Sequence, residues 1–421
     1  MNENSIWNPA QKFAFRLVFI LLPSFAFFYS NVFESDFLFW LQSYPAQLIQ
    51  PIINFIGKYI LSAPDETTFE WKGGGDTISD YLLILTLVII SVAGSTIWTF
   101  IDKERKNYYQ LYYWLEVIIR YYLALILMQY GLAKVIKTQF PFPGLDTLTK
   151  TYGDSSPMNL AWTFFGFSKG YNLFMGFVEL LGMLLIYRRT VTIGALISLG
   201  TTINIMAINY FYDVPVKILS TALVLMCLFL LTPNFKRIWD FFVLSKPSAL
   251  IVFNPVVHKK PVIRALLVVK IMLIGVVFFI TIQHVKSRER IIGDNAVKTP
   301  LYGIYEVETF VINNDTLPPL LTDDIRWKQL VINWPGNARI TFMNDKSYYD
   351  GFKVDTSKKQ IALGYEANNL LNYKIPDQNH LIIYGKLNED SISVIFNKIE
   401  HSNLKLINRG FHWITEVPFN Q

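Results

Sequence analysis

The sequence predicts an all-α polytopic membrane bundle of about seven helices, followed by a C-terminal all-β domain. Seven segments are mostly apolar over roughly 20 residues, which is the length that an α-helix needs to cross a bilayer. Only 17% of the residues are charged, whereas a soluble domain usually carries about 25%. After residue 285 the long apolar runs end, and short alternating segments separated by turn residues begin, as in antiparallel sheets.

The predicted spans cover residues 12–33, 78–101, 111–136, 170–187, 190–212, 215–232 and 262–283. The first lies where a secretory signal peptide would, but its apolar stretch is long and no A-x-A-like cleavage site follows it. We therefore expect a retained helix. Residues 37–61, in the next loop, are aromatic and apolar but contain Pro45 and Pro51. This stretch favours amphipathic helices on the outer membrane face, with a re-entrant hairpin as the alternative.

The orientation follows from Lys and Arg near the span ends, since cytoplasmic loops carry an excess of these residues. With seven spans, all the basic clusters fall on one side of the membrane. The clusters are Lys12/Arg16, Lys103/Arg105/Lys106, Arg188/Arg189, Lys236/Arg237 and Lys259/Lys260/Arg264. The opposite loops are acidic or mixed, as at residues 34–36 and 65–66. The pattern predicts a cytoplasmic N-terminus and a C-terminal domain on the opposite side.

The C-terminal domain contains about eight candidate strands, at residues 302–313, 326–334, 338–343, 348–354, 360–363, 380–387, 391–397 and 404–407. Turn-forming residues at 313–315, 334–337 and 388–390 separate some of them. This spacing predicts an antiparallel meander, closed as a barrel or packed as a sandwich, and a small closed barrel can hold one apolar ligand. We expect Trp327, Trp334 and Trp413 in its core, with Arg409 and His412 helping to close the barrel rather than forming a site.

Several chemistries are excluded by what the sequence lacks. The one cysteine, Cys227, allows neither a disulfide framework nor a C-x-x-C relay within the chain. No histidine lies in the middle of an apolar run, which argues against a haem held between intramembrane histidines. There is no nucleotide motif, no metal motif and no nucleic-acid module. The net charge of +6 arises from clusters that flank the spans, so the bilayer is the expected partner.

Ionisable residues within spans are costly to bury, so each is a functional candidate by default. Glu116 and Arg120 lie four residues apart on one helix face, near the cytoplasmic end of the third span. We interpret them as a structural ion pair. Lys134 lies near the outer end of the same span, where its long side chain either reaches the interface or forms part of a site.

Glu179 lies about halfway along the fourth span, between Gly176 and Gly182. These glycines allow a neighbouring helix to approach closely. A carboxylate at this depth must be protonated, paired or exposed to a wet cavity, and proton relay, ligand binding and helix–helix contact all fit.

Asn209, Asp213 and Lys217 surround the tight turn between the fifth and sixth spans. Taken singly, they are most simply explained as caps of helix ends. Together with Lys134 and Glu179, they lie in the outer half of the membrane. This shared depth predicts a polar ligand-binding pocket among spans three to six that opens outward.

Spans three to six resemble the DoxX family of four-helix membrane proteins, over about residues 111–240. The residues that carry the resemblance are Gly131-Leu132-Ala133-Lys134, Gly176-Phe177-Val178-Glu179-Leu180-Leu181-Gly182, Arg188-Arg189-Thr190 and the small-residue-rich fifth span that ends in Asn209. The C-terminal stretch 408–413 resembles a tail found on long DoxX-like proteins of Bacteroidetes-type bacteria. The resemblance implies a bacterial inner membrane location, with the C-terminal domain in the periplasm.

The resemblance also implies a link to membrane redox systems, because family members include a subunit of a thiosulfate:quinone oxidoreductase and a component associated with superoxide dismutase. Since this chain lacks redox motifs, electrons would require a bound quinone or a redox partner subunit. We therefore expect a redox-linked accessory protein that binds a quinone or lipid-like molecule among its helices. The alternatives are a membrane-anchored scaffold or ligand-binding protein that acts through its β-domain, and a transporter.

The predicted organisation has four parts. Residues 1–110 form N-terminal helices with an outer-face loop, and residues 111–240 form the DoxX-like bundle. Residues 241–285 form a cytoplasmic linker and the last span, and residues 286–421 form the outer β-domain.

Overall fold

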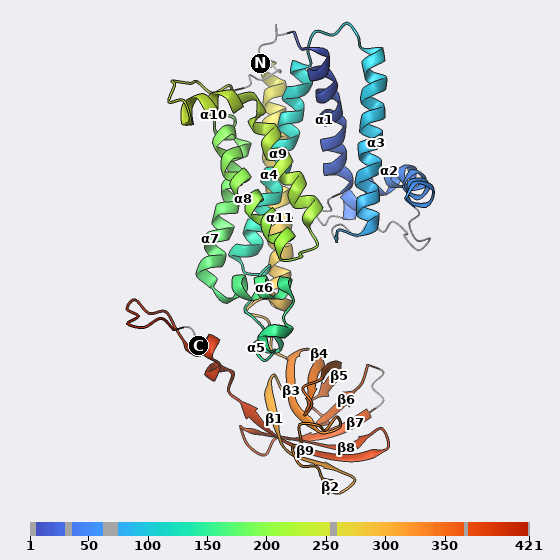
Figure 1. Ribbon diagram of the computed structural model, residues 1–421, viewed down its shortest axis with the longest axis vertical. Coiled ribbons are helices and arrows are strands. Elements are labelled where there is room, and N and C mark those ends of the chain that lie inside the picture. Colours follow the sequence, from blue (N-terminus) through green and yellow to red (C-terminus); the bar gives the residue numbers. More distant parts are fainter. Residues whose placement is uncertain (1–5, 30–35, 62–74, 253–258, 366–368, 420–421) are drawn as a thin grey trace. The chain divides into compact units, whose positions relative to one another are not determined.

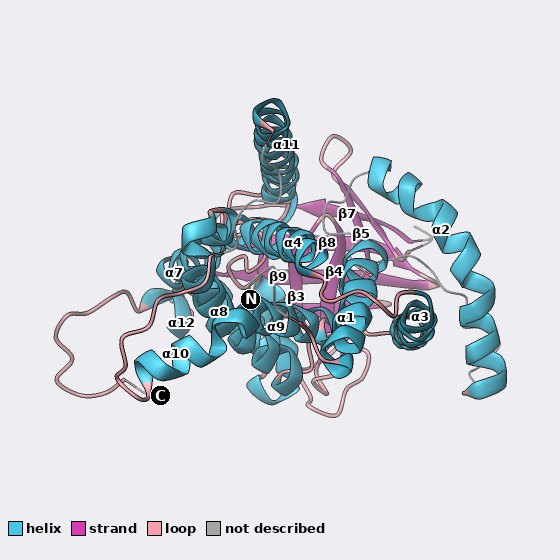
Figure 2. Cartoon of the chain, turned by 90° about the horizontal axis from the view of Figure 1, so that it is seen from above, coloured by secondary structure: helices cyan, strands magenta, loops and turns pink. Residues whose placement is uncertain are grey.

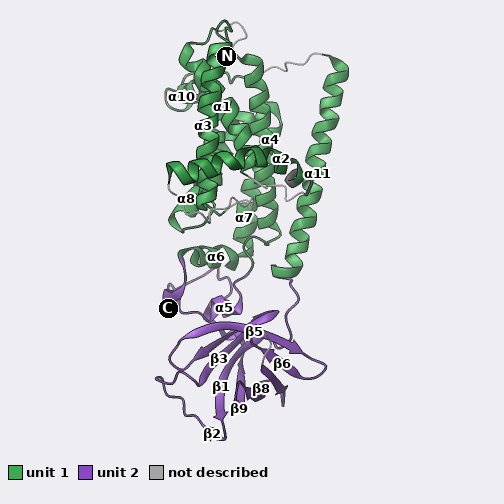
Figure 3. Cartoon of the chain, turned by 90° about the vertical axis from the view of Figure 1, so that its right-hand side faces the viewer, with its two compact units in different colours: residues 1–141, 157–294 green, residues 142–156, 295–421 purple. Residues whose placement is uncertain are grey.

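The computed structural model describes residues 6–29, 36–61, 75–252, 259–365 and 369–419. It divides the chain into two compact units, which Figure 3 colours separately. The helical unit comprises Met1–Pro141 and Pro157–Asp294, and the barrel unit comprises Phe142–Ser156 and Asn295–Gln421. The prediction of a helix bundle with a separate β-domain is confirmed. The observed division differs from the predicted organisation in that residues 142–156 belong with the strands.

Seven helices in the described residues are long and apolar enough to cross a membrane, as the sequence predicted. They are α1 (Pro9–Phe28), α3 (Ile78–Ile101), α4 (Tyr109–Val135), α7 (Lys169–Leu180) with its 3-10 continuation η3 (Leu181–Ile186), α8 (Val191–Phe211), α9 (Lys217–Leu231) and α11 (Lys260–Ile292), as shown in Figure 1. Further helices complete this unit: α2 (Asp36–Phe55), η1 (Ile56–Ile60), α6 (Pro157–Phe167), η4 (Arg188–Thr190), η5 (Thr232–Asn234) and α10 (Phe235–Phe242).

Helix α4 forms the centre of the helical unit and contacts α1, α7, η3, α9 and α11 (Figure 2). Fifteen of its residues are buried, including the charged residues Glu116, Arg120 and Lys134. Helix α11, in contrast, buries only Val277, Thr281 and Val285. Its exposed apolar side chains suit contact with lipid, because a bilayer solvates apolar groups that water would not.

Local sequence signals explain where several helices begin. Asn8 and Gln11 form a reciprocal capping box at the start of α1, and Thr77 and Asp80 form another at the start of α3. Arg16, predicted as a juxtamembrane charge, is instead buried. It donates hydrogen bonds to the hydroxyls of Thr99 and Tyr108 and to the carbonyl of Asp102. Arg16 thereby fastens α1 to the α3–α4 connection.

The loop after α1 is helical, as predicted. Helix α2 and the π-helical turn η1 cover residues 36–60, although Pro45 and Pro51 lie inside α2. Helix α2 runs across the direction of α1 and α3, as Figures 1 and 3 both show. This direction favours the interfacial helix over the re-entrant hairpin, and that choice stays a prediction. Of the acidic residues in the predicted outer loops, Glu34, Asp65 and Glu66 lie outside the described part of the chain, and Asp36 begins α2.

The β-domain is a closed antiparallel barrel. Its strands are β1 (Gly303–Ile312), β2 (Asp315–Thr316), β3 (Trp327–Trp334), β4 (Gly336–Phe342), β5 (Ser347–Asp355), β6 (Gln360–Leu363), β7 (Asn369–Lys374), β8 (His380–Leu387) and β9 (Asp390–Ile399). Neighbouring strands follow chain order from β3 to β9, and β1 pairs with both β3 and β9. Strand β2 only extends the β1 hairpin, where Asn313 and Asn314 adopt the positive φ angles that its turn requires. Of the two predicted alternatives, a closed barrel and a sandwich, the structure shows a closed barrel of eight strands.

The barrel interior is filled by side chains rather than left open. Phe310, Trp327, Ile383 and Phe396 are among its buried residues, each with an exposed fraction of 2% or less. Side chains fill the space inside small eight-stranded barrels in this way. A ligand site inside the barrel stays a prediction.

Four predictions for this domain are wrong. Trp334 and Trp413 are 42% and 91% exposed instead of buried, and Arg409 lies 4.3 Å from the centre of the Phe419 ring, away from the barrel closure. Residues 404–407, predicted as a strand, instead lead into α12 (Lys405–Asn408) after the turn η6 (His401–Asn403). The reason is that Ile399 pairs with Ile304 and completes the barrel, so no strand edge is left for the residues that follow.

The connection between α4 and α6 packs onto the barrel. It contains α5 (Leu145–Leu148) and η2 (Tyr152–Asp154). Asn333 accepts a hydrogen bond from the backbone N–H of Leu145 at 3.2 Å, and Leu145 is buried against Ile304 and Val331. The buried Arg339 donates to the carbonyl of Asp146 at 3.0 Å and to the hydroxyl of Thr149. The loop between α4 and α6, although it connects two helices, is therefore bound to strands β3 and β4 of the barrel.

We expect the double substitution Asn333→Ala/Arg339→Ala to release residues 142–156 from the barrel. Hydrogen bonds that involve a charged group each contribute about 1.5–3 kcal/mol, so amide hydrogen exchange in this segment should accelerate at least about tenfold. Lys353→Ala, at an exposed position on β5, is the control and should leave exchange unchanged. Equal exchange in both variants would contradict the docking.

Candidate functional site

Lys134 on α4 and Glu179 on α7 form a buried ion pair. The Lys134 Nζ lies 2.7 Å from Oε1 and 2.9 Å from Oε2 of Glu179. It also donates to Oε1 of Gln139 at 3.0 Å. The exposed fractions of Lys134 and Glu179 are only 5% and 3%. The three N–H groups of the ammonium thus have one acceptor each, and both carboxylate oxygens contact the same cation.

Two glycines bring α4 and α7 close enough for this pair. A Cβ added at Gly131 would lie 2.8 Å from the carbonyl oxygen of Gly176, and one added at Gly176 would lie 2.7 Å from that of Gly131. The two backbones are therefore in direct contact. Lys134 follows Gly131 by three residues, and Glu179 follows Gly176 by three, so each side chain lies on the same helix face as its glycine. The G-x-x-K motif of α4 and the G-x-x-E motif of α7 therefore meet where the two helices cross.

Aromatic rings complete the surroundings of the ammonium group. The Lys134 Nζ lies 5.6 Å from the centre of the Tyr130 ring and 5.5 Å from that of Phe140. Both distances fall within the range of cation–π attraction. Phe140 is buried and contacts the ring of Trp162 on α6 at 5.1 Å. The Lys134 ammonium is thus surrounded by a carboxylate, an amide and two rings.

Asn209, Asp213 and Lys217 form a separate group at the α8–α9 turn. The side-chain amide of Asn209 donates to the carbonyl of Val216, and Lys217 pairs with the exposed Asp213 at 2.9 Å. The carboxylate of Asp76 accepts hydrogen bonds from the backbone N–H groups of Lys217 and Ile218 at the start of α9. Within the described ranges, no hydrogen bond or ion pair joins this group to Lys134 or Glu179. The five predicted ligand-binding residues therefore fall into two clusters.

A second charged cluster surrounds the other end of α4. Arg120 contacts Glu116 at 3.4 Å, as the predicted ion pair, and donates to the carbonyls of Leu185 and Ile186 at the end of η3. Lys270 on α11 donates to the same Ile186 carbonyl at 3.2 Å. Cations are favourable at the C-terminal end of a helix, where carbonyls lack partners. This cluster therefore ties α4, η3 and α11 together.

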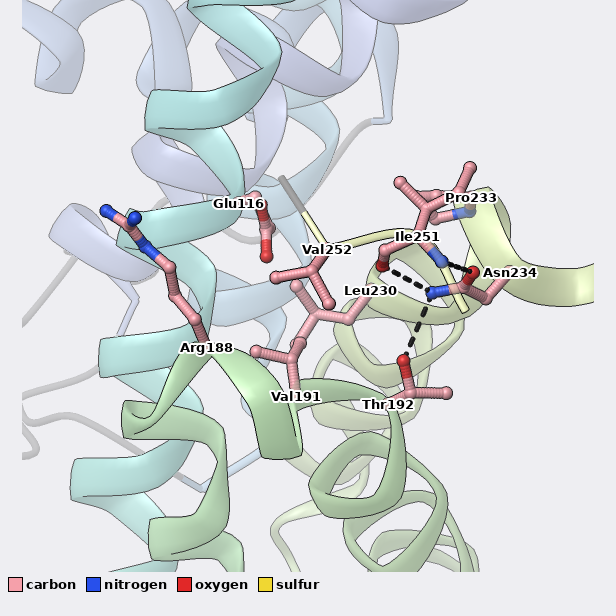
Figure 4. A pocket seen from close by; sticks show the side chains of 9 residues that line it. All are labelled: Glu116, Arg188, Val191, Thr192, Leu230, Pro233, Asn234, Ile251 and Val252. Carbon is pink, nitrogen blue, oxygen red and sulfur yellow. Dashed lines mark hydrogen bonds between the residues drawn. The ribbon is translucent and has the colours of Figure 1, made fainter. Parts of the chain in front are cut away.

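A small pocket adjoins Glu116 and is shown in Figure 4. The Glu116 Oε2 is buried and accepts no hydrogen bond from the described residues. Asn234 forms the opposite wall, where its side chain binds both the N–H and the carbonyl of Ile251 and donates to Thr192. The cavity measures about 10 Å³, which is close to the room that a single water molecule requires. It can hydrate the carboxylate but cannot hold a substrate.

The Lys134–Glu179 pair is therefore the main candidate site, and the structural role of the Glu116–Arg120 pair stays a prediction. Sequence reasoning selected Lys134 and Glu179 separately but missed Gln139, Asp76 and Lys270. Of these three residues, only Gln139 lies near a motif that could have pointed to it, because it follows Lys134 of the G-x-x-K motif by five residues. Within the described residues, no group of three His, Cys, Asp or Glu side chains is placed to hold a metal ion.

Comparisons with known proteins found one similar sequence. Over 124 residues the chain is 41% identical to the uncharacterized protein YwoB of Bacillus subtilis (strain 168), and this match covers 29% of the chain and 79% of that protein. No family model matches the chain, and no solved structure matches it. The resemblance to the DoxX family stays a prediction.

Proposed function

Given that the chain belongs to the family of the uncharacterized Bacillus subtilis protein YwoB, we propose from the site itself that its helical unit binds a lipid-soluble molecule with a hydrogen-bonding head, of the quinone class. The chain then acts as a DoxX-like, redox-linked accessory protein that has a redox partner subunit. The basic clusters support an inner-membrane protein with a cytoplasmic N-terminus and a periplasmic barrel unit.

The observation that carries this proposal is the burial of Lys134 against Glu179 inside a membrane-spanning bundle. Removing two charges from water costs several kcal/mol per ion, and an apolar pair would pack the helices as well. Charged residues at this depth therefore tend to mark substrate or proton pathways. The pair also provides both a strong donor and a strong acceptor in one place, which a quinone carbonyl and a quinol hydroxyl require.

The geometry also identifies which contact a ligand would replace. Gln139 is the neutral acceptor of the three around Lys134, and it lies beyond the end of α4. A carbonyl oxygen can take its place without breaking the ion pair. The rings of Tyr130 and Phe140, whose centres lie 5.6 Å and 5.5 Å from the ammonium nitrogen, then offer flat surfaces to the ring of the ligand. Glu179 can accept a proton from a hydroxyl that lies beside it.

Binding can be tested by titrating a short-chain ubiquinone into the full-length protein in nanodiscs and following tryptophan fluorescence, since Trp162 lies next to Phe140. We expect saturable quenching by the wild type. Glu179→Gln should weaken binding by about tenfold or more, because the Lys134 ammonium loses the carboxylate that holds it in place to donate to the quinone carbonyl, and a hydrogen bond to a charged group contributes about 1.5–3 kcal/mol.

The matched control is Glu104→Gln, the same change at an exposed position between α3 and α4. This variant should bind the quinone like the wild type. Non-saturable quenching, or equal affinity in wild type and Glu179→Gln, would argue against a quinone site at this pair.

A further inference from the structure

The barrel unit carries a cleft at the end of the barrel where β1 and β8 begin and β9 ends. Its volume is about 480 Å³, within the range of sites for small molecules. It forms where the chain that enters β1, the loop before β8 and the end of β9 come together. The backbone N–H of Lys398 on β9 donates to the carbonyl of Asn379 in that loop at 2.7 Å, so two of the walls are fastened to each other. The cleft is therefore preformed.

Two lysines give the cleft a positive charge. Lys298 and Lys398 both line it, and neither forms an ion pair with any residue in the described part of the chain. The Nζ of Lys298 lies 4.6 Å from the centre of the Tyr302 ring, and the stem of Lys398 packs beside Gly303. The one acidic residue in the lining, Glu400, already accepts a hydrogen bond from Ser402. Two cations thus face the cleft without a partner of opposite charge.

His380 also lines the cleft but is engaged by acids. Its Nδ1 lies 2.9 Å from the carboxylate of Asp377, and its Nε2 lies 3.8 Å from Glu308. The hydrogen bond to Asp377 raises the pKa of His380 above its ordinary value. Because its charge is balanced by these two carboxylates, the lysines remain the main source of positive potential.

Aromatic side chains form the apolar part of the lining. Tyr305 is buried and donates its hydroxyl to the carbonyl of Leu301 at 2.9 Å. Burial raises the pKa of Tyr305 to about 12, so its ring lines the cleft as an uncharged surface. The ring of Tyr302 meets that of His401 edge to face, with 6.4 Å between the ring centres. The cleft therefore combines flat apolar surfaces with cations.

We propose that this cleft is a binding site for a small organic anion with an apolar or aromatic body. The carboxylate, sulfonate or phosphate of the ligand binds Lys298 and Lys398, and its body packs against Tyr302 and Tyr305. A cationic ligand would be repelled, and a neutral one would leave both ammonium groups unpaired. This site is independent of the ion pair in the helical unit.

The test uses the full-length protein in nanodiscs of zwitterionic lipid, with 1-naphthyl phosphate as the probe and isothermal titration calorimetry as the readout. The wild type should bind one equivalent, with an affinity that falls as salt is added. Lys298→Ala/Lys398→Ala should weaken binding at least about tenfold, because two charge-assisted contacts are lost. Lys346→Ala/Lys353→Ala removes the same charge from exposed positions outside the cleft and should bind within about twofold of wild type.

No binding by the wild type, or equal binding by the two double variants, would overturn the proposal. An unchanged tryptophan emission spectrum, to which the buried Trp327 contributes, checks that each variant is folded. Nanodiscs that contain phosphatidylglycerol separate the two sources of such an anion. Unchanged probe affinity in these nanodiscs assigns the cleft to a soluble anion, whereas competition that requires both lysines assigns it to a lipid headgroup.

Discussion

Replacing Lys134 with Met is expected to destabilise the helical unit by about 3–5 kcal/mol, which is the typical cost of removing one partner of a buried ion pair. Glu179, with an exposed fraction of 3%, would then be left without its cation. The double variant Lys134→Met/Glu179→Leu should cost clearly less than the single change, since no charge stays buried. Stability can be measured by thermal unfolding of the protein in nanodiscs.

The control is Lys217→Met, the same change in an ion pair whose acid, Asp213, is exposed to solvent. Exposed pairs contribute little to stability, so this variant should unfold close to the wild type. If the double variant cost as much as the two single changes added together, the two charges would not be coupled. The interpretation of Lys134 and Glu179 as one unit would then be wrong.

Replacing Gly176 with Val should separate α4 from α7. The new Cβ would lie 2.7 Å from the carbonyl oxygen of Gly131 and 3.0 Å from the backbone nitrogen of Val135. Backbone atoms cannot move aside as a flexible side chain can, so the whole helix must shift. Overpacking of this kind costs about 1–3 kcal/mol or more, and the shift should also break the 2.7 Å contact between Lys134 and Glu179. Thermal unfolding and quinone titration of the same sample should both report the change.

Gly200 on α8 provides a matched control, because a Cβ added there meets nothing within 4 Å. Gly200→Val should fold and bind like the wild type. Equal tolerance of Val at positions 176 and 200 would show that close contact between α4 and α7 is not required for stability.

The spans were predictable because membrane insertion depends on apolar length, which is a property of each segment alone. All seven predicted spans correspond to long helices in the structure. Strand β7 was missed because the polar Asn369 shares a face with the buried Leu371 and Tyr373, while the apolar Leu370 is exposed on the other face, so apolar and polar residues do not alternate regularly. The position of residues 142–156 was also hidden from the sequence, because it depends on Asn333 and Arg339 almost 200 residues away.

The candidate site was only partly predictable. Lys134 and Glu179 could be selected singly, because charged residues in spans are rare and costly. Their pairing depends on how α4 and α7 rotate against each other, and the two glycines set that rotation. Asn209, Asp213 and Lys217 lie at a similar predicted depth, yet they bond to the α8–α9 turn instead. Depth along a helix does not determine which face a residue occupies.

The binding of a quinone-class molecule at Lys134 and Glu179 is tested most directly by identifying what co-purifies with the protein. Wild type, Glu179→Gln and Glu104→Gln would be extracted under the same mild conditions, and their bound small molecules would be identified by mass spectrometry. The account predicts a quinone-class molecule retained by wild type and Glu104→Gln and lost from Glu179→Gln. The same quinone content in all three samples, or none in any of them, would contradict it.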